Sequence, residues 1–385
     1  MRLSWIELRD FRNHGETRLD VPDGLVVAVG DNGEGKSNLL EGAFYLLSQS
    51  SPRVATDAPL IRHGAQSAYL RGEVETAEGR VLIEVEIRSA GANRIQVNRS
   101  AVRRRRDVRR RVSGVFFGPN DLSIVHGDPD ARRRFMEECV LALWPLREAE
   151  ARAYDKALRQ RNRLLKDWEG RGEPPELSAW DEELVASGAA VTAARREAMR
   201  RVGPNSSEEF EAVAGYQLDI AYRPAVEGEP VPEAFRERLA ARRSDELVRR
   251  TTLVGPHRDE LDMAVRELRA RGFASHGESW AAALALRAGL GRTVQDELGE
   301  PPVLVLDDPF SALDPARQAR VAEGLARRGQ TLISVADESH VPDLAAAVWE
   351  VRAGEVKVRE VGGAGSPDMG RVVELHGDRT PGTER

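Results

Sequence analysis

The chain has 385 residues and a formal net charge of −6 at pH 7, with 41% hydrophobic and 31% charged residues. This composition is typical of a globular protein with one large domain or two, and any affinity for nucleic acid must come from a local basic patch. The single cysteine, Cys139, excludes an internal disulfide and favours a reducing compartment, and we expect it to be a small core residue of a helix. Since the sequence shows neither a signal peptide nor an apolar run of membrane-spanning length, we expect a cytoplasmic protein without a membrane partner.

The start of the chain predicts a hairpin and then a buried strand. Residues 1–20 have the pattern of an edge hairpin, and the short apolar run 25–29 is typical of a strand buried on both faces. Apolar residues then recur at helical spacing from Leu39 to Leu47.

Between this strand and this helix lies a match to the phosphate-binding loop pattern G-x-x-x-x-G-K-[ST], at Gly30, Gly35, Lys36 and Ser37. Glycines let consecutive backbone N–H groups turn towards phosphate oxygens, and the helix N-terminus adds positive charge. The lysine of this motif reaches the β- and γ-phosphates, and the serine hydroxyl holds Mg²⁺. We therefore predict that a nucleotide binds at Gly30, Asp31, Asn32, Gly33, Glu34, Gly35, Lys36, Ser37 and Asn38, with Mg²⁺ held at Ser37.

The alternative is a chance glycine turn, since the chain contains 34 glycines. Lysine decides against it, because the chain has only four lysines: Lys36, Lys156, Lys166 and Lys357.

Residues 68–98 alternate polar and apolar side chains, which predicts antiparallel strands with turns at Gly79 and Gly91. A basic run follows, made of Arg103, Arg104, Arg105, Arg106, Arg109, Arg110 and Arg111. These arginines could hold a nucleic acid backbone, or they could form a solvated helix end or hairpin. The sequence leaves both interpretations open.

The middle of the chain is mostly helical. Residues 131–201 predict two long helices separated by the Gly- and Pro-rich stretch 170–175, an αα-hairpin. Residues 203–235 are rich in glycine and proline around one predicted strand at 216–222, and 251–254 is strand-like.

A second chemical motif follows far downstream. Residues 302–306 predict a buried strand that ends in Asp307 and Asp308. P-loop ATPases place a Walker B carboxylate at the end of such a strand, so we expect Asp307 to orient the Mg²⁺ shell and Asp308 to align or deprotonate the attacking water. A helix at 315–328 and a parallel strand at 331–335 come next, and we expect residues 361–385 to form a mobile tail.

These motifs occur in an order that resembles the RecF family of bacterial recombination mediators, which are ABC-type ATPase heads of the SMC kind. The resemblance is nearly collinear from residue 1 to about residue 336. It rests on the Walker motifs and on the stretches 11–14, 39–41, 51–53, 117–122, 132–135, 160–166 and 255–259.

The resemblance implies an α/β fold, an ABC-type P-loop ATPase head with a mixed β-sheet lobe and an inserted helical lobe. Residues 1–125 and 290–360 would form the lobe with Walker A and Walker B, and residues 126–289 the helical lobe with the ABC signature. The signature is expected at 274–280, where Ser275 and Gly277 match the family pattern while His276, Ser279 and Trp280 depart from it. The resemblance also places Arg12 among the nucleotide contacts.

The resemblance further implies how such heads act. The signature of one subunit caps ATP held by the P-loop of the other, so ATP drives a homodimer and slow hydrolysis releases it. The family's partner is gapped DNA or a single-/double-strand junction, where it acts with RecR and RecO in DNA repair, replication and the SOS response to help load RecA. The activity implied is a weak DNA-stimulated ATPase that serves as a switch.

Two other classes of function remain as alternatives. An ABC transporter subunit would share the Walker motifs and a signature, but the usual Leu-Ser-Gly-Gly-Gln is absent and the Walker motifs lie too far apart. A scaffold that binds nucleotide without turnover would carry the same motifs. A kinase interpretation of His257-Arg258-Asp259 fails because Ala264 stands where that motif requires asparagine.

Overall fold

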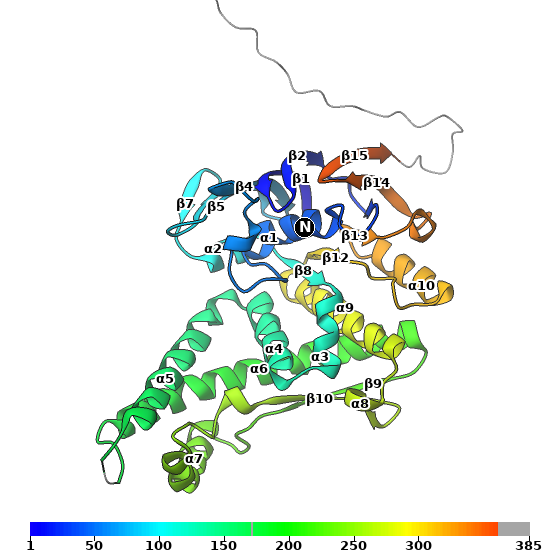
Figure 1. Ribbon diagram of the computed structural model, residues 1–385. Helices are drawn as coiled ribbons and strands as arrows, with labels where there is room; N and C mark the ends of the chain where they lie inside the picture. Colours follow the sequence, from blue (N-terminus) through cyan, green and yellow to red (C-terminus); the bar gives the residue numbers. More distant parts are fainter. Residues whose placement is uncertain (171, 361–385) are drawn as a thin grey trace, which may run out of the picture. The chain divides into compact units, whose positions relative to one another are not determined.

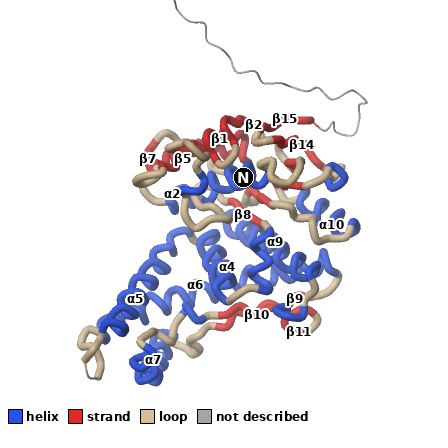
Figure 2. Tube along the Cα trace, in the orientation of Figure 1, coloured by secondary structure: helices blue, strands red, loops and turns tan. Residues whose placement is uncertain are grey.

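The computed structural model describes residues 1–170 and 172–360. The chain forms two compact units, one made of Met1–Arg103, Val303–Phe310 and the chain from Val321, the other of Arg104–Pro302 and Ser311–Arg320. Strands dominate the first unit and helices the second (Figures 1 and 2). The division into lobes made from the sequence stays a prediction, and the predicted tail 361–385 lies outside the described residues.

An antiparallel sheet of the first unit has the strand order β2-β1-β4-β5-β6-β7. Its strands are β1 (Arg2–Phe11), β2 (His14–Asp20), β4 (Ser67–Thr76), β5 (Gly79–Arg88), β6 (Arg94–Val97) and β7 (Ser100–Val102). The hairpin predicted for residues 1–20 is confirmed, and β2 is an edge strand. The antiparallel strands predicted within 68–98 are confirmed as β4, β5 and β6.

The second sheet of this unit carries the Walker motifs. Within the unit its order is β15 (Glu355–Glu360), β14 (Ala345–Arg352), β3 (Leu25–Val29), β13 (Thr331–Val335) and β12 (Val303–Leu306). β13 and β14 run parallel to β3, and β12 runs parallel to β13. All five residues of β3 are buried, which explains its continuous apolar sequence.

Helix α1 (Lys36–Ser48) contacts strands of both sheets, and the short helices η1 (Ala58–Leu60) and η5 (Glu338–His340) complete the unit. Gln330 links its two sheets: its side-chain oxygen accepts from Leu3 N and its amide nitrogen donates to Leu3 O. Helix α10 (Pro315–Ala326) begins in the second unit and ends in the first.

The second unit is built on long helices. Its elements are α2 (Arg105–Arg109), β8 (Gly114–Phe117), η2 (Pro119–Asp121), α3 (Leu122–His126), α4 (Pro129–Leu143), η3 (Pro145–Arg147), α5 (Glu148–Asp167), α6 (Leu177–Ala214), β9 (Leu218–Arg223), α7 (Val231–Arg249), η4 (Pro256–Arg258), β10 (Glu260–Val265), β11 (Leu268–Arg269), α8 (Ala270–Phe273) and α9 (His276–Leu298). The last three strands in this series form an antiparallel sheet in the order β11-β10-β9.

Helices α6 and α9 pack closely because their contact is lined by small residues. A Cβ atom at Gly289 would lie 2.3 Å from Ser206 Oγ, so only glycine allows this approach. Asn205 donates to Thr293 Oγ1 at 2.9 Å beside it. Cys139 is fully buried on α4, as expected from the sequence.

Two predictions for this unit are wrong. Residues 131–201 form parts of three helices, since α4 ends at Leu143 and Pro145 keeps Trp144 out of the helical conformation. Residues 251–254 form no strand: Thr252 N donates to Asn162 Oδ1 and Leu253 N to Glu246 Oε1, so side chains take the place of a neighbouring strand. The hairpin predicted around 170–175 is confirmed by the packing of α5 on α6 (Figure 1).

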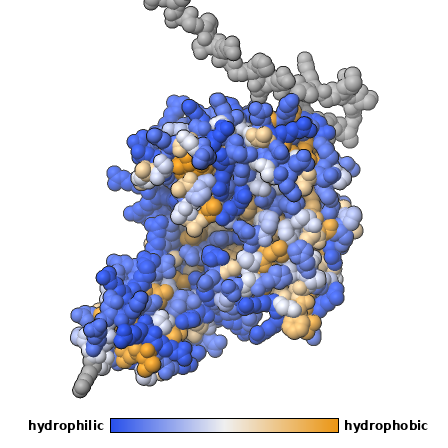
Figure 3. Space-filling model, viewed as in Figure 1, coloured by the Kyte–Doolittle hydropathy of each residue, from blue (hydrophilic) through white to orange (hydrophobic). Residues whose placement is uncertain are grey.

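None of the helices in residues 1–170 and 172–360 is long and apolar enough to cross a membrane. The face drawn in Figure 3 is largely hydrophilic, with small separate patches of apolar side chains. The exposed large apolar residues are Tyr69, Leu146, Val248, Leu268, Phe273, Leu298 and Leu344.

Candidate nucleotide-binding site

The loop from Gly30 to Gly35 connects β3 to α1, as the motif requires. Gly30 has φ +154°, and a Cβ there would lie 2.3 Å from Val351 O. Gly35 caps the helix with φ +117°, and a Cβ there would meet the Asn13 side chain at 2.6 Å. Only glycine fits both positions, so the glycines of the motif are needed for the fold of the loop.

Two turns of the same unit hold this loop in place. Glu34 O accepts from Asn13 Nδ2 at 3.0 Å and from Gly354 N at 2.8 Å, and its carboxylate accepts from Ala353 N. His14 is fully buried, and its ring contacts Gly35 O and the Thr17 hydroxyl. A carbonyl can only accept, so Nε2 of His14 carries the hydrogen, and burial lowers the pKa of this neutral ring.

Lys36 begins α1 and is only 7% exposed. Its ammonium donates to Gly30 O at 2.6 Å and Asp31 O at 2.8 Å. Burial lowers its pKa, whereas Asp307 and Asp308 raise it through their charges. The lysine therefore lies at the centre of the loop with both Walker B carboxylates within electrostatic range.

The two Walker motifs meet through the serine that follows this lysine. Ser37 Oγ donates to Asp307 Oδ1 at 2.7 Å, and Ser334 Oγ donates to the same oxygen at 2.7 Å. Asp307 is 7% exposed at the end of β12. A serine hydroxyl and a carboxylate side by side are oxygen ligands of the kind that Mg²⁺ prefers, so the residues present fit this ion.

Asp308 is the next residue and adopts a left-handed backbone with φ +53°. Its N–H donates to Ser334 Oγ at 2.9 Å, so one serine fixes both members of the acidic pair. Non-glycine residues with such a backbone are uncommon and gather at functional sites.

A buried ion-pair network borders the loop on α1. Arg12 forms two hydrogen bonds to the Glu41 carboxylate, at 2.8 and 2.9 Å, and donates to Pro59 O. Glu41 is fully buried and also accepts from Ser51 Oγ and Arg53. Arg12, a predicted nucleotide contact, is therefore held beside the first turns of α1 by a carboxylate of that helix.

Sequence reasoning gave no role to Asn13, His14 or Ser334. Asn13 joins the loop to the helix, since it donates to Glu34 O and accepts from Asn38 Nδ2 at 2.7 Å. Asn13 and His14 lie in the stretch 11–14 that carries the resemblance, which was the available signal. No sequence pattern pointed to Ser334, which the parallel pairing of β13 with β12 places beside Asp307.

The predicted signature residues belong to the second unit. Ser275 is the N-cap of α9, where Ser275 and Glu278 form a reciprocal capping box. Ser275 is exposed and Gly277 is half-buried. Their position at the start of a long helix agrees with an anion-binding role, which remains a prediction.

The arginine run surrounds α2. Arg103, Arg104, Arg110 and Arg111 are exposed, whereas Arg105, Arg106 and Arg109 are half-buried. Burial is also the main cause that lowers the pKa of Arg109. The run is therefore only partly a solvent-facing surface.

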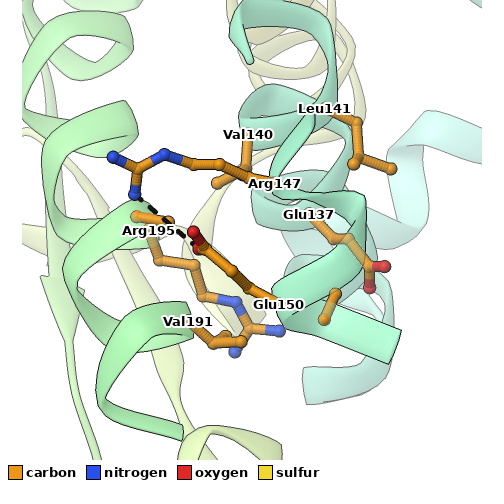
Figure 4. Close-up of a pocket in the computed structure, with 9 residues that line it drawn as sticks. Glu137, Val140, Leu141, Arg147, Glu150, Val191 and Arg195 are labelled. Atoms are coloured by element: carbon orange, nitrogen blue, oxygen red, sulfur yellow. Dashed lines mark ion pairs between the residues drawn. The ribbon is translucent and has the colours of Figure 1, made fainter. Parts of the chain in front are cut away.

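The second unit also contains a small cavity between α4, α5 and α6, drawn in Figure 4. Glu137, Arg147, Glu150 and Arg195 line it together with apolar side chains, and Arg147 pairs with Glu150 at 3.9 Å. None of the predicted site residues lies in its wall.

Comparisons with known proteins identify the family of this chain. The family model described as "RecF/RecN/SMC N terminal domain" matches residues 2–357. The DNA replication and repair protein RecF of Cutibacterium acnes is 39% identical, covering 94% of this chain and 99% of its own. RecF of Frankia alni is 40% identical, and the match covers 92% of this chain and 99% of the Frankia protein.

Solved structures give the same result. The recombination mediator protein RecF with ATP, described as part of the RecFOR pathway, superimposes with a TM-score of 0.85 at 27% identity, covering 92% of this chain and 97% of that one. The Smc head domain of Pyrococcus furiosus shares the fold with a TM-score of 0.53 at 17% identity, and the match covers 92% of this chain and 95% of that one. The expected fold, an ABC-type ATPase head, is confirmed. The chain belongs to the RecF family, within the group described as RecF/RecN/SMC N terminal domain.

Proposed function

We propose that this protein is an ATP-dependent DNA-binding protein of recombinational repair and replication. The observation that carries the proposal is the joining of Walker A to Walker B by the 2.7 Å hydrogen bond from Ser37 to Asp307, beside the buried ammonium of Lys36. The relatives named as DNA replication and repair proteins, and a RecF structure described with ATP, support it.

In this proposal the loop residues Gly30 to Asn38 bind the triphosphate of ATP. Lys36 exchanges its backbone acceptors Gly30 O and Asp31 O for β- and γ-phosphate oxygens. Ser37 and Asp307 would hold Mg²⁺, which when bound neutralises phosphate charge. Asp308 aligns or deprotonates the attacking water, and its backbone is held by the hydrogen bond from its N–H to Ser334 Oγ.

Ser275 and Gly277 act on the nucleotide of a second copy. The N-terminus of α9 offers backbone N–H groups and a hydroxyl to the γ-phosphate, so ATP holds a homodimer together. Hydrolysis removes these contacts and releases the dimer, so the protein works as a weak, DNA-stimulated switch.

The proposed DNA partner is a gapped duplex or single-/double-strand junction in the cytoplasm. Contact with the phosphate backbone would make binding insensitive to sequence and sensitive to salt. RecR and RecO are the proposed protein partners and RecA the protein loaded as a result, which the RecFOR pathway named for a structural relative supports.

The test is the change Lys36→Met, which removes the cation that would meet the β- and γ-phosphates. We expect loss of ATP-dependent dimerisation in sedimentation velocity, with the monomer still folded. Lys156→Met is the matched control, because Lys156 is an exposed lysine of α5. Dimerisation of the Lys36 variant at the wild-type ATP concentration would refute the assignment.

The same protein preparation separates the alternatives. A single-turnover assay with and without gapped DNA distinguishes a switch ATPase from a scaffold that binds ATP without turnover. A transporter subunit predicts turnover that gapped DNA leaves unchanged.

A further inference from the structure

The turn between α6 and β9 brings Tyr216 to the start of α9. Its ring contacts the buried Phe210 edge-on at 5.5 Å, and the Arg266 guanidinium lies over the ring at 4.0 Å. Gly215, with φ +84°, ends α6 and lets the chain turn there. Phe210 and Arg266 therefore hold the tyrosine ring in place, so its hydroxyl has a fixed position.

That hydroxyl donates to Glu278 Oε1 at 2.7 Å. The other carboxylate oxygen accepts from Ser275 N at 2.8 Å, and Ser275 Oγ accepts from Glu278 N at 3.3 Å. These contacts lower the pKa of Glu278. The hydrogen bond from the Ser275 backbone has the largest effect, the Tyr216 hydroxyl comes next, and the Ser275 hydroxyl adds a smaller one. A negative charge therefore lies against the serine that is proposed to meet a phosphate.

We propose that Tyr216 is a positioning residue of the signature, which holds the Glu278 carboxylate away from the anion that Ser275 binds. This inference rests on the proposed function, because it assumes that Ser275 contacts the γ-phosphate of a second copy. It adds a residue that lies outside the signature stretch 274–280.

The physical reason is competition for the same donor. A carboxylate and a γ-phosphate oxygen both attract the Ser275 hydroxyl, and the two anions repel each other. The Tyr216 hydroxyl satisfies Oε1, and Arg266 adds a positive charge that stabilises the carboxylate in this position. Without the tyrosine hydroxyl, the carboxylate has one donor fewer and draws more strongly on the serine hydroxyl, which it already contacts.

The test compares ATP-dependent dimerisation of the full chain for four variants in sedimentation velocity with ATP and Mg²⁺. For Tyr216→Phe we expect the dimer dissociation constant to rise about tenfold or more, as for the loss of a hydrogen bond to a charged group. Glu278→Gln keeps the capping box but removes the negative charge. The dimer dissociation constant of the double variant Tyr216→Phe/Glu278→Gln should therefore lie within about threefold of the value for Glu278→Gln alone.

The fourth variant, Tyr222→Phe, removes a similar tyrosine–carboxylate hydrogen bond, from Tyr222 to Asp259 at 2.6 Å, and should dimerise like wild type. ATP binding by dilute monomer should stay unchanged in Tyr216→Phe, which separates this effect from unfolding. Wild-type dimerisation by Tyr216→Phe, or failure of Glu278→Gln to rescue it, would overturn the positioning role alone. A wild-type protein that stays monomeric with ATP would overturn the proposed function and this inference with it.

Discussion

Arg161 shows how a single buried charge organises the second unit. The side chain is fully buried on α5 and pairs with Asp181 of α6 and Glu246 of α7. It also donates to Thr252 Oγ1 at 2.8 Å. Because a buried arginine is tolerated only with full pairing, these three partners fix how the two helices and the segment after α7 meet α5.

His257, five residues beyond Thr252, has an equally defined environment. Its Nε2 donates to Thr252 O, and its Nδ1 accepts from the Tyr154 hydroxyl at 2.6 Å. The pKa of this ring is lowered to about 4, mainly by burial. The hydrogen bond to Thr252 O opposes this shift, and the charges of Arg258, Arg133 and Arg161 add to it. The ring is therefore neutral in the folded protein at neutral pH.

We predict that this histidine makes stability depend on pH in the acid range. The unfolded chain binds a proton at about pH 6.5, whereas the folded chain does so only near pH 4, so stability is full above pH 6.5 and falls as the pH drops towards 4. The loss amounts to about 3 kcal/mol. Urea unfolding between pH 4 and pH 7.5 measures it, and His257→Gln should flatten the slope. An unchanged slope would contradict the assignment.

Among the elements, α2 and its flanks carry the arginine run that is the candidate DNA contact. We predict that replacing the exposed Arg103, Arg104, Arg110 and Arg111 with Gln lowers affinity for gapped DNA equally for all sequences. The slope of log affinity against log salt should become shallower by about 0.7–0.9 for each phosphate that the variant no longer neutralises.

The matched control removes the same charge from another surface, with Gln at the exposed Arg159, Arg163, Arg238 and Arg242 of α5 and α7. Fluorescence anisotropy at several salt concentrations measures both sets. Equal salt slopes for the two sets would show that the run is ordinary solvated surface.

Which elements could be predicted from the sequence depends on where their hydrogen bonds go. The strand at 25–29 and the strand before Asp307 were predictable, because continuous apolar runs between loop motifs indicate buried parallel strands. The interruption at Trp144 was missed although Pro145 was visible, because the charged helical pattern continues on both sides. The segment 251–254 was wrongly predicted as a strand because side chains accept its backbone hydrogen bonds. Thr252 N donates to Asn162, which is distant in sequence, and Leu253 N donates to Glu246 on the preceding helix.

In the candidate site, the residues proposed to contact the nucleotide have a sequence pattern, whereas the residues that support them have none. A spacing motif identifies Lys36 and Ser37 because phosphate chemistry demands those types at those positions. Ser334 and Tyr216 are ordinary in sequence, and their roles come from strand pairing and from a turn that only the fold defines.

For the whole protein, the proposed dimer cycle requires that ATP binding and ATP hydrolysis can be separated. Lys36 and Ser37 are proposed to act in binding, whereas Asp308 is proposed to act only on the attacking water. Its backbone N–H is held by Ser334, so changing its side chain to an amide leaves that hydrogen bond in place. Asp308→Asn therefore removes the negative charge of the side chain without removing the hydrogen bond that holds the backbone.

We predict that Asp308→Asn binds ATP and dimerises on gapped DNA but hydrolyses ATP at least about 100-fold more slowly, because the water loses its base. The complex should then persist after dilution, whereas the wild-type complex dissociates as ATP is consumed. Phosphate release and the lifetime of the DNA complex are the two measurements, with wild type plus ADP as the state that should not hold DNA. The substitution leaves Asp307 beside Ser37. Failure of the Asp308→Asn variant to bind ATP would therefore assign Asp308 to ATP binding. Hydrolysis at the wild-type rate would show that Asp308 takes no part in the hydrolysis step.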